Sequence, residues 1–177
     1  MATPVLALIA IAMRLSGDNG PFLYRAPRVG QSRTFMVLKV RTMTAGSSGS
    51  KVTLANDPRV TRIGRTLRRY RLDELPQLLN VIRGEMSLVG PRPEDPAYVD
   101  LANPLHLRVF SAKPGITGLA QLAYRDEAEL LAGPDADQRY RHEILPAKLR
   151  LDAEYLDHRT TVLDLKILAR TVGTMMR

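Results

Sequence analysis

An apolar segment, PVLALIAIAMRL, occupies residues 4–15 of the chain and limits how its first residues can fold. As a helix rising 1.5 Å per residue, these dozen positions would be about 18 Å long. A bilayer core of about 30 Å needs roughly 20 apolar residues, so the segment is too short to span a membrane. No basic stretch precedes Val5, as a signal peptide would require. Two interpretations remain: a buried core helix, or a helix that dips into one leaflet and is held at its exit by Arg14.

Length and composition restrict the rest of the molecule to one ordinary domain. The chain has 177 residues, enough for a single core. It contains no cysteine, which excludes disulfides and thiolate metal sites, and its three histidines lie too far apart for a metal-ligand spacing. The net charge of +8 favours an anionic partner. Nucleic acid, a phosphorylated small molecule and an acidic membrane surface all have this property.

The segment after the apolar start predicts a β-hairpin between a turn and a loop. Residues 16–21, SGDNGP, have turn composition, and residues 22–43 alternate loosely with β-forming side chains. They predict two short strands joined through residues 29–32. The small polar residues 44–51 predict a mobile loop. Asp57 is then expected to be the N-cap of the next helix, with Pro58 as its first residue.

An acidic pair, Asp73 and Glu74, follows a basic stretch in which an arginine recurs at every third position from 59 to 71. At 3.6 residues per turn these arginines fan around a helix, and a solvated basic face would explain them. Leucines at spacings of three and four predict a second helix over residues 72–82, and Pro76 would end or kink a helix continuing from residue 58. The pair then lies in a first helical turn, where the dipole stabilises negative charge. It is either a helix-start ion pair or a catalytic dyad.

A stiff loop, GPRP at residues 90–93, comes after a helix stop at Gly84 and a short extended piece at residues 86–89. Its two prolines fix the backbone of Arg92 between them. A guanidinium held in this way suits bidentate recognition of a phosphate or a carboxylate, and the alternative is a turn with a solvent-facing arginine.

The remaining residues predict helices and a second loop. Residues 95–112 are partly helical, residues 113–118 form a second turn-rich loop before Arg125, and residues 137–157 form a charged helix kinked at Pro146. The last stretch is a basic amphipathic helix. Its apolar face is expected to carry Leu165, Leu168, Val172 and Met175. That face would lie on an anionic membrane or pack on the domain.

Four motifs, in this order, together resemble one family. They are GPFLYRAPRVG with LKVRTM, RLDELPQLLNVIRGEMSLVGPRPE, KPGITGLAQ, and LDLKIL. From about residue 4 to about residue 170 the chain resembles the bacterial sugar transferases known as monotopic phosphoglycosyl transferases. The resemblance implies transfer of a phosphosugar from a UDP-sugar to polyprenyl (undecaprenyl) phosphate, with release of UMP. This reaction initiates exopolysaccharide, O-antigen or glycan synthesis.

The resemblance also implies roles for particular residues. Asp73 would be the nucleophile of an Asp73–Glu74 dyad that also binds the required Mg²⁺. Glu74 would orient Asp73, help to hold the metal or take a proton from the acceptor. The phosphate-contacting positions would be Lys39, Arg41, Arg92 and Arg125. Cations around the dyad would reduce the repulsion between a carboxylate and a diphosphate, and would favour the ionised form of Asp73.

The expected fold is an α/β (α+β) single small domain with a short sheet and amphipathic, membrane-facing helices. In the family, a re-entrant N-terminal helix bends at a Ser-Pro step, which Thr3-Pro4 resembles. Residues 1–16 are therefore expected to be a truncated, membrane-dipping helix, and residues 17–177 the catalytic domain. The resemblance implies a monotopic protein on the cytoplasmic face of the inner membrane, with the membrane surface as a partner and homo-oligomerisation left open.

Two other functions are compatible with parts of the sequence. The arginines and the net charge would suit a basic nucleic-acid-binding domain. The chain, however, is only 5% aromatic and carries no recognised DNA- or RNA-binding motif, so nucleic acid is not an expected partner. A non-catalytic membrane scaffold is the other alternative. The presence of Asp73, Glu74, Arg92 and Arg125 argues against it.

Overall fold

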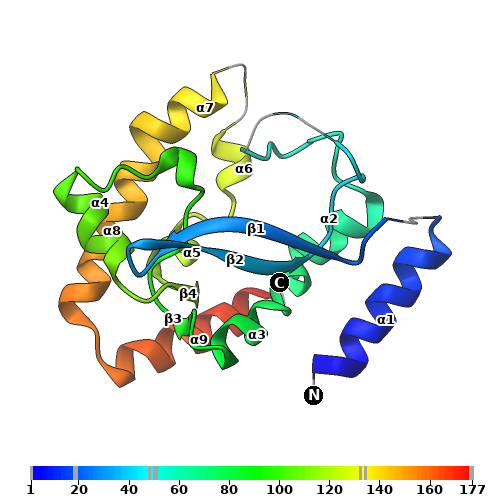
Figure 1. Cartoon of the computed structure of the whole chain (residues 1–177), viewed down its shortest axis with the longest axis horizontal. Coiled ribbons are helices and arrows are strands. Elements are labelled where there is room, and N and C mark those ends of the chain that lie inside the picture. The colour runs from blue at the N-terminus through cyan, green and yellow to red at the C-terminus, as the bar shows by residue number, and fades with distance from the viewer. Residues whose placement is uncertain are drawn as a thin grey trace.

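The computed structural model describes residues 2–17, 20–47, 49, 52–131, 133 and 135–175. The elements form one small mixed α/β domain, with helices around two separate two-stranded sheets (Figure 1). The α-helices of the described chain are α1 (Ala2–Leu15), α2 (Arg62–Arg69), α3 (Gln77–Ile82), α4 (Pro104–Ser111), α5 (Leu119–Ala123), α6 (Glu127–Leu130), α7 (Ala136–Arg139), α8 (Leu145–His158) and α9 (Thr161–Met175). Shorter turns are the 3₁₀ segments η1 (Leu72–Glu74) and η2 (Pro96–Tyr98) and the π-helical turn η3 (Tyr140–Ile144).

The first sheet is the predicted hairpin. Strand β1 (Leu23–Gly30) pairs antiparallel with β2 (Arg33–Val40), and Leu23 lies opposite Val40. Gln31 and Ser32 form the connection, and both have a φ of 53°. Two residues in this left-handed region match the twist of a tight hairpin, so the connection needs only two residues and not the four expected.

The second sheet was not predicted. Strand β3 (Ser87–Val89) pairs in parallel with β4 (Gly115–Thr117), although residues 113–118 were expected to be a turn-rich loop. The sequence prediction for this segment is wrong because the pairing depends on a long crossover, which local composition does not report. Gly115 permits the close approach. A Cβ atom there would lie 2.1 Å from the backbone nitrogen of Gly90.

The start of α2 also differs from the prediction. The N-cap is Thr61, whose hydroxyl accepts a hydrogen bond of 2.9 Å from the backbone N–H of Gly64. Asp57 is instead paired with Arg59, at 2.6 Å between Oδ2 and Nη2. Because its carboxylate accepts from both the backbone and the side chain of Arg59, Asp57 stabilises a turn before the helix.

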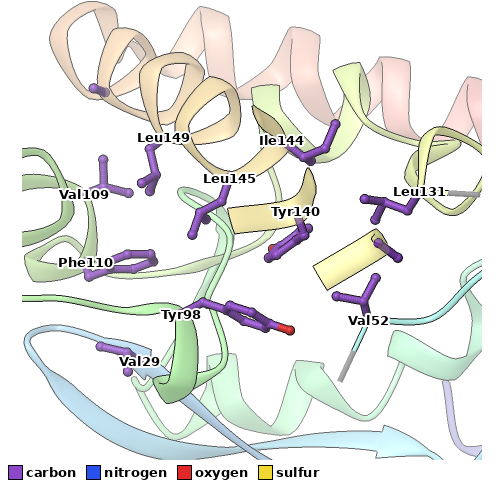
Figure 2. Packing of buried hydrophobic residues seen from close by; sticks show 12 residues of the cluster. Val29, Val52, Tyr98, Val109, Phe110, Leu131, Tyr140, Ile144, Leu145 and Leu149 are labelled. Carbon is purple, nitrogen blue, oxygen red and sulfur yellow. The ribbon is translucent and has the colours of Figure 1, made fainter. Parts of the chain in front are cut away.

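The largest core cluster lies between the hairpin and the helices at residues 104–158 (Figure 2). Tyr98 and Tyr140 meet edge to face at its centre, with 4.9 Å between ring centroids. Helix α8 supplies Leu145 and Leu149, both buried. The single helix predicted over residues 137–157 is divided into α7, the π-helical turn η3 and α8, with Pro146 in the first turn of α8, so a kink at Pro146 stays a prediction.

The two terminal helices are each packed on one side and exposed on the other. On α1, Ile9 and Met13 are buried against the domain, whereas Leu8 is 68% and Ile11 56% exposed. A fully buried α1 is therefore excluded. On α9, Ile167 is the buried residue, and Leu165 and Val172 of the predicted apolar face remain exposed.

Within the described residues, no helix is both long and apolar enough to cross a membrane. Parts of the predicted turn at residues 16–21 and of the predicted loop at residues 44–51 lie outside the described residues.

Candidate active site

The acidic pair lies on η1, a single turn between α2 and α3. Helix α2 ends at Arg69 with Tyr70 as its C-cap, before it reaches Pro76, which was expected to end or kink it. Arg71 then takes a left-handed conformation with a φ of 51°, which costs an L-residue about 1–2 kcal/mol. Glu74 closes the new turn by donating its backbone N–H to the carbonyl of Arg71, at 3.1 Å. The predicted placement of both carboxylates in a first helical turn is confirmed.

Glu74 is the firmly ionised member of the pair. Its Oε1 lies 3.2 Å from Nζ of Lys39 and 3.7 Å from Nη1 of Arg92. Burial by itself would raise the pKa of Glu74, but Lys39, Arg92 and Arg71 together lower it to about 2. Glu74 therefore carries a permanent negative charge that holds two cations from distant parts of the chain.

Asp73 has the opposite shift. Its residue is only 8% exposed, and burial raises the pKa of its carboxyl above the ordinary value. Lys39 and Arg68 oppose this rise, while the charge of Glu74 adds to it. The expectation that the basic field would leave Asp73 favoured as an anion is thus wrong in net direction, because lost hydration outweighs the attraction of the cations.

The two cations on Glu74 come from rigid elements. Lys39 projects from β2, and burial lowers its pKa while Glu74 raises it. Arg92 lies on the predicted loop, and its backbone N–H donates to Oδ2 of Asp152 at 3.1 Å. Lys39 and Arg92 also line a small cavity of about 10 Å³ together with Arg28, just large enough for one water molecule.

Asp152, which sequence reasoning missed, anchors the Arg92 loop from α8. Burial raises the pKa of its carboxyl to about 7, although the N–H groups of Arg92 and Ala120 and the charge of Lys148 oppose the shift. Its Oδ1 is buried and has no hydrogen-bond partner among the described residues. An acidic residue at a helix position flanked by Leu149 and Ala153 was the available clue, since such positions usually face the core.

Arg71 is the second residue that was missed as part of the site. Its Nη2 donates to the carbonyl of Gln121 at 2.9 Å. Burial lowers the pKa of Arg71, Glu74 raises it, and the charges of Arg92 and Arg125 lower it. These interactions place Arg125, which follows α5, within electrostatic range of the same cluster. A non-glycine residue at positive φ is a clue visible only in the structure.

Arg41 is held differently from the other predicted phosphate contacts. It is 7% exposed, its Nε donates to the carbonyl of Pro21 at 2.7 Å, and its Nη1 donates to that of Met43 at 2.9 Å. These bonds tie the entry and exit of the hairpin together. A phosphate contact by Arg41 stays a prediction.

The donor groups fit a metal that is shared with a substrate. Mg²⁺ is usually held by one or two carboxylates together with substrate phosphates. Asp73 and Glu74 supply two adjacent carboxylates, and the described residues contain no cluster of three or more acidic or histidine side chains that could form a protein cage. Glu74 is already paired with Lys39 and Arg92, whereas the described chain shows no ion pair to Asp73.

The chain is similar to known proteins over nearly its whole length. The profile of the family described as "Bacterial sugar transferase" matches residues 1–177. A relative from Caulobacter vibrioides, "UDP-glucose:undecaprenyl-phosphate glucose-1-phosphate transferase", is 40% identical over 98% of this chain and 63% of its own length. A protein of the same name from Escherichia coli (strain K12) is 38% identical over 97% of this chain and 36% of its own.

A third relative is named for a different sugar. The "UDP-N-acetylgalactosamine-undecaprenyl-phosphate N-acetylgalactosaminephosphotransferase" of Aeromonas hydrophila is 33% identical over 98% of this chain and 40% of its own length. The chain spans less than two thirds of the length of all three relatives. Since the family profile and these matches cover nearly every residue, the chain belongs to the bacterial sugar transferase family.

Proposed function

We propose that this protein transfers a sugar-1-phosphate from a UDP-sugar to polyprenyl (undecaprenyl) phosphate and so initiates exopolysaccharide or related glycan synthesis. The observation that carries the proposal is the Asp73–Glu74 pair, in which Asp73 is buried and Glu74 is partly buried, with Lys39, Arg92 and Arg71 around it. Relatives over nearly the whole chain are named for this class of transfer. Both substrates are phosphate anions, so a reaction between them requires cations at the reacting centre.

The chemistry divides into two displacements at one phosphorus. In the first, an oxygen of Asp73 bonds to the sugar-bearing phosphorus of the UDP-sugar, and the bond to the bridging oxygen breaks, so its electron pair leaves on UMP. In the second, an oxygen of the polyprenyl phosphate bonds to the same phosphorus and the bond to Asp73 breaks, which restores the carboxylate. The products are UMP and a polyprenyl diphosphate sugar.

The two carboxylates differ in what they can do. A pKa of about 2 makes Glu74 a poor base at neutral pH, and its ion pairs hold Lys39 and Arg92 toward the reacting phosphates. Asp73, with its raised pKa, is the stronger nucleophile of the two once it is ionised. We therefore assign the attack to Asp73 and the positioning of cations to Glu74.

Mg²⁺ would be held by Asp73 and Glu74 together with the substrate diphosphate, and when bound it would withdraw negative charge from the phosphoryl oxygens. The phosphates would also contact Lys39, Arg92 and Arg125. Arg71 joins this set, because its charge acts on the same cluster. The basic side chains thus converge on an enclosed acidic pair, which favours a small phosphorylated substrate over a nucleic acid backbone.

Membrane association is part of the same proposal. Residues 1–16 would form the membrane-dipping segment and residues 17–177 the catalytic domain. The support comes from α1, whose outer side exposes Val5, Leu8, Ile11 and Leu15. Apolar side chains on one side of a helix gain free energy by entering a lipid interface. We infer that the active site lies on the cytoplasmic face of the inner membrane, because the proposed donor is a UDP-sugar.

The direct test is detection of the covalent intermediate. Incubation with a panel of UDP-sugars and Mg²⁺, without acceptor, is expected to add the mass of one phosphosugar to Asp73 and to release an equal amount of UMP. Intact-protein and peptide mass spectrometry would locate the adduct. Asp73→Asn is expected to abolish both the adduct and UMP release. Full turnover by the pure Asp73→Asn variant would refute the assignment of the nucleophile.

A further inference from the structure

An apolar groove of about 150 Å³ lies between α3, the β3–β4 pair and α9. We call it the α3–α9 groove. Its apolar wall is formed by Leu75, Leu78, Leu88, Ile116, Leu168 and Met175. Thr117 and Thr171, which also line it, are joined by a hydrogen bond of 2.7 Å between their hydroxyls. An apolar cavity of this size holds a benzene-sized group, so the groove accommodates about one branched five-carbon unit.

The groove ends against the acidic pair. Arg71 and Glu74 complete its lining, although its accessible surface is apolar, so they contribute their hydrocarbon stems. The carboxylate of Glu74 faces Lys39 and Arg92, and the guanidinium of Arg71 reaches the carbonyl of Gln121. A molecule lying in the groove would therefore have its end beside the charged cluster. In Figure 1, α3 and α9 lie next to one another on the side of the molecule opposite α7.

Arg71 has spare capacity for an anion. A guanidinium has five N–H donors, and the hydrogen bond described for Arg71 uses one of them. Lys39, Arg68, Arg71 and Arg92 act on the two carboxyl groups of Asp73 and Glu74, and Arg125 acts on Arg71, so cations outnumber the carboxylates of the pair. An amphiphile with a phosphate at one end and an apolar tail matches both the excess positive charge and the apolar groove.

We propose, building on the function proposed above, that the α3–α9 groove binds the first isoprene unit of the polyprenyl phosphate acceptor and that Arg71 receives its phosphate. The acceptor then approaches the dyad along α9, from the side formed by the Arg71 and Glu74 stems. Filling the groove should impair the second displacement while leaving the first intact, because the UDP-sugar does not occupy it.

The test uses two tryptophan substitutions on α3. Leu78→Trp fills the groove, whereas Ile82→Trp is its control on the same helix, at a residue that is 80% exposed and outside the groove lining. Farnesyl phosphate in detergent is the probe, with its Kd measured by calorimetry. We expect Leu78→Trp and Arg71→Gln each to weaken binding about tenfold or more, as loss of one charge-assisted or packing contact does. Ile82→Trp should bind like the unaltered protein.

Catalysis supplies an independent readout. With a UDP-sugar and no acceptor, Leu78→Trp should retain the UMP burst of the unaltered protein, while steady-state turnover with undecaprenyl phosphate falls about tenfold or more. If Leu78→Trp misfolds, Leu88→Trp, at an exposed residue of β3 that lines the groove, replaces it, with the same expectations. Absence of a burst from the unaltered protein would count against the proposed function alone. Unchanged farnesyl phosphate binding by both groove-filling variants and Arg71→Gln would overturn the acceptor site.

Discussion

Adjacent residues with the same acidic group have different electrostatic environments in this protein. Glu74 faces Lys39 and Arg92, and its pKa falls to about 2, whereas burial raises the pKa of Asp73. The difference follows from the 3₁₀ turn, which points consecutive side chains in different directions. One carboxylate can therefore organise cations while its neighbour remains available for a covalent bond.

Lys39 provides a pH-dependent test of this arrangement. Its charge lowers the raised pKa of Asp73, so Lys39→Gln should move the pH profile of the UMP burst to higher pH and reduce the rate at neutral pH. Arg33→Gln, an exposed cation at the other end of β2, is the charge-matched control. The rate of the UMP burst, measured from pH 5 to pH 9 for both variants, gives these profiles. A profile for Lys39→Gln that coincides with that of Arg33→Gln would contradict the coupling.

Asp152 predicts a pH effect on stability. Its folded-state pKa is about 7, above the ordinary value of 3.8, so the folded protein binds more protons between these values. The free energy of unfolding should therefore fall as pH rises from about 4 to about 7 and level off above that. Asp152→Asn should remove this component, and Glu154→Gln, exposed on the same helix, should not. Urea unfolding at pH 5 and pH 8 measures this difference. An equal pH dependence of the unaltered protein, Asp152→Asn and Glu154→Gln would contradict the role of Asp152.

At the scale of elements, the parallel β3–β4 pair positions the loop that carries Arg92. The backbone N–H of Gly115 donates to the carbonyl of Pro91 at 2.9 Å, and Asp152 receives the next N–H, from Arg92. The loop is thus held from β4 on one side and from α8 on the other. Two prolines restrict its backbone, but the contacts across the chain decide where its arginine lies.

Gly115→Ala tests this close approach. Its Cβ would lie 2.1 Å from the nitrogen of Gly90 and 2.6 Å from the carbonyl carbon of Val89, both backbone atoms that cannot move aside easily. We expect a loss of about 1–3 kcal/mol in the free energy of unfolding, as for other overpacked sites, together with a lower UMP burst rate. Gly173→Ala is the control, since nothing lies within 4 Å of its Cβ position on α9. It should be neutral or stabilise the helix by up to about 1 kcal/mol. Equal stability of the two variants would contradict the prediction.

Across the molecule, three helices, α1, α3 and α9, expose large apolar side chains. In Figure 1, α1 lies at the edge of the molecule, and its N-terminal end, α3 and α9 all lie in the lower half of the view. Each of these helices exposes large apolar side chains, including Leu8 on α1, Ile82 on α3 and Leu165 on α9. Such a surface suits a lipid interface and would bring the α3–α9 groove close to the tail of a membrane-bound acceptor.

Membrane binding should therefore depend on α1. The double substitution Leu8→Glu with Ile11→Glu places two charges on its exposed side and should abolish co-sedimentation with vesicles of phosphatidylglycerol and phosphatidylethanolamine. The domain should stay folded, because neither residue is buried. Leu101→Glu, an exposed leucine remote in sequence from α1, is the control and should still co-sediment. Retained vesicle binding by the double variant would exclude α1 as the anchor.

Local sequence patterns predict the elements that depend only on neighbouring residues. Alternating residues and a turn predict the β1–β2 hairpin. Gly84, which has a φ of 77°, predicts the end of α3. The acidic pair lies in the predicted helical turn. The family motifs also point to the Asp73–Glu74 pair and to the loop that carries Arg92. These features depend on backbone propensities and on residues only a few positions apart.

The remaining features depend on contacts between segments that are distant in the sequence. In the folded chain β3 pairs with β4, Asp57 pairs with Arg59, and Thr61 is the N-cap of α2. Folding also places Arg71 and Asp152 at the site, through their hydrogen bonds to Gln121 and Arg92. It also reversed the expected pKa shift of Asp73, because the balance between burial and nearby cations is a sum over residues far apart in the chain. Desolvation and close backbone contact arise only when such segments meet, and for that reason local sequence patterns do not report them.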